Sequence, residues 1–63
     1  MGRYGWSYLQ VTLHEAGHWL ASDGGSFADE RSMLDELGAT GWELVAVRER
    51  PSGVVFYFKR PRT

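Results

Sequence analysis

The sequence predicts a small α+β domain, in which a three- to four-stranded antiparallel sheet has one helix packed on one face. Two patterns support this class. Apolar residues recur at helical spacing over residues 27–37, whereas residues 42–59 follow a period of two and are rich in strand-forming side chains. A chain of 63 residues suits one small core. We therefore predict a single domain over residues 1–63, in the order β-hairpin, helix, β-hairpin.

The N-terminal third favours strands, with a helix as the alternative. Aromatic and β-branched residues are frequent before residue 13, and Gly17 would cost a helix about 1 kcal/mol. In the helical alternative, apolar side chains line up at Leu9, Leu13, Ala16 and Leu20. The preferred elements are a strand over residues 4–14, a turn at residues 16–17 and a strand over residues 18–21.

The central helix is predicted from Phe27 to Leu37. Ser26 is a suitable N-cap residue, and Asp29 three positions later resembles the partner in a capping box. Gly38 then fits the position after the helix, where the chain adopts the left-handed conformation.

The second hairpin follows Gly41. Both faces of its first strand begin with apolar residues, which predicts that this strand is covered on both sides. A turn at residues 50–53 leads to a strand over residues 54–59, and Pro61 ends it.

Residues 37–45 have the pattern L-G-x-x-G-W-E-L-V. Residues 6–11 match W-x-Y-x-x-V, and residues 58–60 are F-K-R. Together these blocks resemble a small family of bacterial and phage domains of unknown function, from which the chain departs over residues 12–25. The resemblance implies a fold and no catalytic residues. Within the signature we expect structural roles: Gly38 ends the helix, Gly41 allows a close turn and Trp42 anchors the core.

The chain's two histidines lie in His14-Glu15-Ala16-Gly17-His18, which matches the H-E-x-x-H motif of zinc metalloproteases. On a helix both imidazoles would bind one zinc ion, and Glu15 would act as the base. In the predicted hairpin, however, His14 pairs with Trp19 and Glu15 with His18, so the imidazoles lie on opposite faces. A short chain also leaves little room for a substrate cleft. We therefore predict no enzyme, metal or cofactor, with a zinc hydrolase using His14, Glu15 and His18 as the alternative.

One helix can cover only one face of the sheet, so the other face is predicted to be an interface. Its expected aromatic residues are Trp6, Tyr8, Trp19 and Tyr57. We predict a non-catalytic protein-interaction or self-assembling module whose partner is itself, as a homo-oligomer, or another protein.

Charge and composition limit the remaining candidate functions and the expected location of the protein. The net charge of −1 argues against a general affinity for nucleic acids. A second alternative is weak nucleic-acid binding through the basic C-terminal hairpin, with Arg48, Arg50, Lys59, Arg60 and Arg62. No apolar run is long enough for a membrane span, and no secretory signal or cysteine occurs, so we expect no membrane association and a cytoplasmic location.

Overall fold

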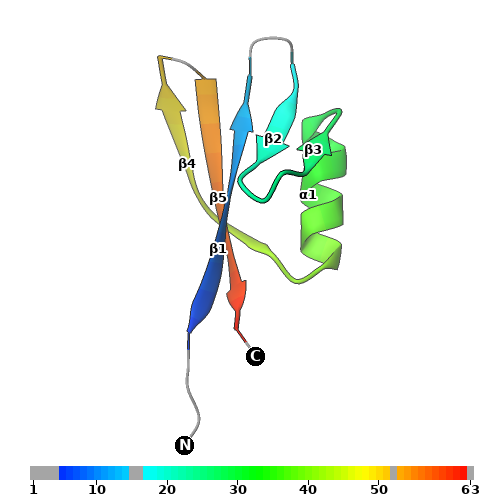
Figure 1. Ribbon diagram of the computed structural model, residues 1–63, viewed down its shortest axis with the longest axis vertical. Coiled ribbons are helices and arrows are strands. Elements are labelled where there is room, and N and C mark those ends of the chain that lie inside the picture. Colours follow the sequence, from blue (N-terminus) through cyan, green and yellow to red (C-terminus); the bar gives the residue numbers. More distant parts are fainter. Residues whose placement is uncertain (1–4, 15–16, 52, 63) are drawn as a thin grey trace, which may run out of the picture.

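The computed structural model describes residues 5–14, 17–51 and 53–62, and Figure 1 shows one antiparallel sheet beside one helix. The strand order across the sheet is β3-β2-β1-β5-β4. The elements are β1 Trp6–Leu13, β2 Trp19–Ala21, β3 Ser26–Phe27, α1 Glu30–Ala39, β4 Glu43–Arg50 and β5 Gly53–Pro61.

The predicted sheet of three to four strands is therefore wrong. The sheet has five strands and dominates the α+β fold, while α1 is its one short helix within the described residues. The additional strand is β3, whose residues were predicted to begin the helix. Ala21 donates its N–H to the carbonyl of Gly25 (2.8 Å), which closes a tight turn. The chain then returns along β2, with Phe27 opposite Trp19.

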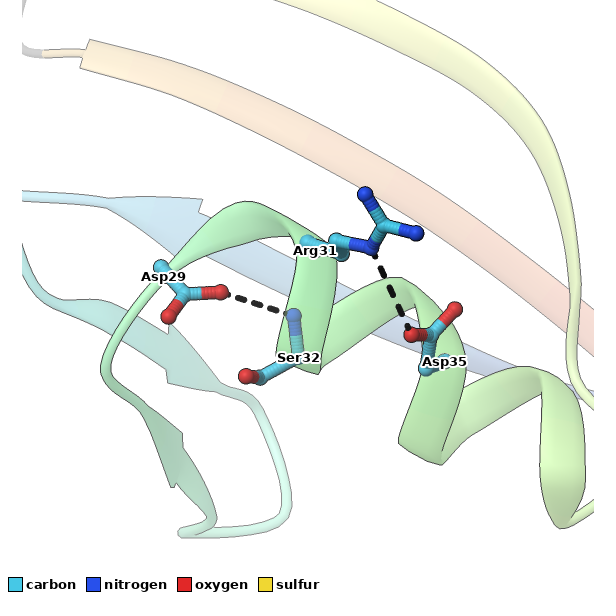
Figure 2. Close-up of polar contacts among 4 residues, drawn as sticks. All are labelled: Asp29, Arg31, Ser32 and Asp35. Carbon is cyan, nitrogen blue, oxygen red and sulfur yellow. Dashed lines mark hydrogen bonds and ion pairs between the residues drawn. The ribbon is translucent and has the colours of Figure 1, made fainter.

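The helix begins later than predicted because Asp29, and not Ser26, caps it. Asp29 has extended backbone angles, and its carboxylate accepts a hydrogen bond from the Ser32 N–H (2.8 Å; Figure 2). This hydrogen bond from Ser32 lowers the pKa of Asp29 below its ordinary value. Figure 2 also shows Arg31 beside Asp35. Arg31 Nε lies 4.0 Å from Asp35 Oδ2, and this exposed pair stabilises the helix little.

The helix ends in a Schellman motif. Trp42 donates its N–H to the carbonyl of Leu37 (2.9 Å), and Gly41 donates to Gly38 (3.1 Å). Gly41 takes the left-handed conformation with φ +92°. Gly41, and not the predicted Gly38, is thus the glycine that terminates the helix. Trp42, which was predicted to anchor the core, is half-buried and packs against the margin of the core.

Arg60 supplies the positive charge that the last turn of α1 lacks. Its Nη1 donates to the carbonyl of Thr40 (2.8 Å), and its guanidinium lies 4.3 Å from the centre of the Trp42 ring. A cation at this position is favoured by the helix dipole and by the face of the indole. Arg60 therefore joins β5 to the end of the helix.

The core lies between α1 and one face of the sheet, which we call the inner face; the opposite face is the outer face. The Trp19 and Phe56 rings meet edge to face, with their centres 4.9 Å apart. Trp42 and four other partly buried apolar residues surround the core. The buried residues of the core cluster are Leu9, Val11, Trp19, Ala21, Met33, Leu37, Phe56 and Phe58.

The alternation predicted for the N-terminal strand is confirmed over β1, which excludes the helical alternative for residues 9–13. β1 pairs along its whole length with β5, from Trp6 opposite Pro61 to Leu13 opposite Val54. The residues nearest the two chain ends therefore build the centre of the sheet. Because β1 and β5 are so far apart in sequence, no local pattern identifies this pairing.

Candidate functional site

The first candidate site is the histidine-containing end of the β1–β2 hairpin. His14 donates its N–H to the carbonyl of His18 (2.8 Å), and Gly17 donates to the carbonyl of His14 (2.9 Å). Gly17 has φ +81°, the left-handed conformation that closes a three-residue hairpin loop. Residues 15 and 16, including the candidate base Glu15, lie outside the described residues.

The predicted pairing of this hairpin is wrong by one residue. Leu13, and not His14, lies opposite Trp19, and His14 faces His18 across the ribbon. Residues directly opposite each other share a face, so both imidazoles leave the sheet on its outer side, where both residues are exposed. The prediction failed because the loop has three residues rather than two, and one extra loop residue moves every side chain to the other face.

This arrangement differs from that of a helical H-E-x-x-H motif, because the histidines adjoin Leu13 and Trp19, which are strand residues. No cluster of three or more His, Asp or Glu side chains suited to a metal occurs among residues 5–14, 17–51 and 53–62. What the hairpin offers is a pair of neighbouring imidazoles.

The second candidate site is the outer face. Trp6 and Tyr8 are 43% and 69% exposed there, and Tyr57 lies on the same face opposite Gln10. Lys59 Nζ lies 4.0 Å from the centre of the Trp6 ring, which holds the indole against the sheet. Three of the four aromatic residues predicted for an interface are thus brought together.

The fourth aromatic residue, Trp19, is placed elsewhere. It is 5% exposed and belongs to the core on the inner face, where it contacts Phe56. The one-residue error in the hairpin register accounts for this difference, since it assigned Trp19 to the wrong side of β2. Leu20, its neighbour, is 44% exposed on the outer face.

The third candidate site is β4, which sequence reasoning missed. It was predicted to be covered on both sides, but it is the outermost strand beside β5, and each of its residues is exposed. Leu44, Val45 and Val47 are 38%, 45% and 50% exposed. The charged second half of the strand, from Arg48 to Arg50, was the available signal, because charges are typical of edge strands.

The basic C-terminal residues are largely engaged with the chain itself. Lys59 stacks on Trp6, Arg60 bonds Thr40, and Arg62 Nη2 donates to the carbonyl of Trp6 (3.3 Å). Beside them lies a surface hollow of about 500 Å³, lined by Ser7, Thr40, Gly41, Arg60, Pro61 and Arg62. These contacts orient three of the five predicted nucleic-acid-binding cations toward protein groups.

Comparisons with known proteins identify a family without an assigned activity. A family model described as "Domain of unknown function (DUF4177)" matches residues 6–61, which span β1 to β5. No curated protein matches the chain, and no solved structure matches it. Within the described part of the chain, no helix has the length and apolar character needed to cross a membrane.

Proposed function

The chain belongs to a family of domains of unknown function (DUF4177), and we propose that it acts as a non-catalytic, self-assembling protein-interaction module. The observation that carries this proposal is the exposure of large apolar side chains along the sheet. Trp6 and Tyr8 lie on the outer face, and Leu44, Val45 and Val47 lie on β4. These are two separate groups, since Leu44 and Val47 lie on the inner face, and exposed groups of large apolar side chains are typical of interfaces.

The small size of the core supports the same conclusion. A chain of 63 residues buries a modest fraction of its surface when it folds, and the chain has no cysteine for a disulfide. Association of folded copies would remove further apolar surface from water and stabilise the folded state by mass action. Self-assembly would thus offset the limit that size sets on stability.

The proposal predicts reversible association that depends on concentration. In sedimentation equilibrium from micromolar to millimolar protein, the weight-average mass is expected to rise above that of a monomer. The midpoint of thermal unfolding should rise over the same range, because association stabilises the folded state. A constant monomer mass, with a midpoint independent of concentration, would contradict self-assembly.

A second candidate function is metal binding by the histidine pair. The observation in its favour is the backbone hydrogen bond from His14 to His18, which sets the two residues opposite each other on one face. Neutral imidazoles are good ligands for Zn²⁺, Cu²⁺ and Ni²⁺. Two protein ligands would leave the remaining coordination positions to water or to a second molecule.

For this candidate we expect Zn²⁺ titrated calorimetrically at neutral pH to bind the wild type at least about tenfold more tightly than either His14→Ala or His18→Ala. The matched control is the double variant Thr12→His/His14→Ala, which keeps two histidines on the outer face but places one opposite Leu20. It should bind as weakly as the single variants. Equal affinity in all four proteins would eliminate the site.

A further inference from the structure

The sheet has one long free edge. β3, at one end of the sheet, has two residues, whereas β4, at the other end, has eight. Figure 1 shows the C-terminal half of β4 on the side of the sheet away from α1, and each residue of β4 is exposed. An edge strand presents unpaired N–H and C=O groups to which another strand can bond.

We propose that a second copy of this chain pairs with β4 through its own β4, antiparallel and about a two-fold axis. In the proposed register, Glu43 lies opposite Arg48 of the second copy, Leu44 opposite its Val47, and Val45 opposite its Ala46. Two-fold symmetry makes each of these contacts twice. The inference rests on the proposed function and names the partner and the strand.

The orientation of the side chains within one chain supports this register. Leu44 and Val47 pair with Phe58 and Phe56 of β5, which places them on the inner face. Glu43 pairs with Lys59, on the outer face. Arg48 pairs with Val55 and shares that outer face. Directly opposite residues of paired strands share a face. The register therefore joins apolar residues on the inner side and opposite charges on the outer side.

Neighbouring registers are less favourable. A shift of one residue puts Glu43, on the outer face, opposite Glu49 of the second copy, which lies on the inner face because it pairs with Val54. Directly opposite residues share a face, so this register does not fit. A shift of two residues puts Leu44 opposite Glu49. The β4–β5 pairing has an irregularity between Leu44 and Ala46, and such bulges often protect an edge. In the proposed register the two irregularities meet at the symmetry axis, where Val45 faces Ala46.

Charge-reversal variants test this register. Glu43→Arg alone and Arg48→Glu alone should each weaken dimerisation about tenfold, because two attractive pairs become repulsive. The double variant Glu43→Arg/Arg48→Glu should recover the wild-type dissociation constant. An equimolar mixture of the single variants should form a heterodimer, since every charge then faces its opposite. Sedimentation equilibrium gives the constants, and circular dichroism checks that each variant is folded.

Two controls separate this inference from the proposed function. Glu49→Arg makes the same charge change on β4 but has no charged residue opposite it in the proposed register, so dimerisation should be unchanged. Tyr8→Glu places a charge on the outer face and should also leave the dimer intact. If the wild type associates but only Tyr8→Glu dissociates it, the β4 register is wrong and self-assembly stands. Failure of the double variant or the mixture to restore association also overturns the register, and a monomeric wild type overturns both proposals.

Discussion

Replacement of Phe58 by alanine is expected to remove a large part of the free energy of unfolding of the chain. Phe58 is 2% exposed and lies among the core residues of β1, β5 and α1. Removing a buried phenylalanine side chain costs about 3–5 kcal/mol, through lost burial and the cavity left behind. A chain of this length has a total free energy of unfolding of only about 3–9 kcal/mol.

The measurement is urea unfolding followed by circular dichroism. The matched control is Phe58→Leu, which keeps most of the apolar volume and should cost under about 1.5 kcal/mol. An alanine variant as stable as the leucine variant would show that the core tolerates the cavity, and that Phe58 is not the central packing residue.

Gly53→Ala is the second substitution with a large expected effect, about 3 kcal/mol or more. Gly53 opens β5 with φ +144°, a conformation that residues with a side chain rarely adopt. A Cβ atom at this position would also collide with the carbonyl oxygen of Leu13 on the neighbouring strand. Because that oxygen belongs to the backbone of β1, the collision can be relieved only if β1 and β5 move apart.

Gly17→Ala is the matched control for this prediction, because Gly17 also has a positive φ (+81°). Among the described residues other than its chain neighbours, no atom lies within 4 Å of the position that a Cβ would occupy there. Backbone strain alone should cost about 1–2 kcal/mol at this glycine. Thermal unfolding of the two variants at equal protein concentration separates strain from collision. Equal losses of stability would show that the collision with Leu13 is relieved at no cost.

Local sequence patterns predicted the strands and the helix correctly wherever residues close together in the chain determine the structure. Residues 6–13 alternate between the two faces in the structure as they do in the sequence, and β5 follows the predicted strand. The error at the start of the helix arose because Ser26 and Asp29 are both good caps. Pairing with β2 takes Ser26 into the sheet and leaves Asp29 to begin the helix.

The candidate sites were harder to predict because each depends on non-local pairing. The aromatic outer face was recovered for Trp6, Tyr8 and Tyr57, which lie on the two long strands that pair in the centre of the sheet. The prediction failed for Trp19, because the face that Trp19 occupies depends on the length of the loop before β2. The exposure of β4 could not be inferred from its apolar residues, which are as suitable for a central strand as for an edge used in assembly.

The amino-acid sequence by itself determined the type of each long element, since periodicity, capping and glycine placement act within a few residues. It also carried the family signature, including the Gly41-Trp42 step that closes the helix. The tertiary structure alone decided which strand lies at the edge, which side Trp19 occupies and that His14 faces His18. The physical reason is that a strand's face and neighbours depend on register, and register is set by contacts between residues far apart in the chain.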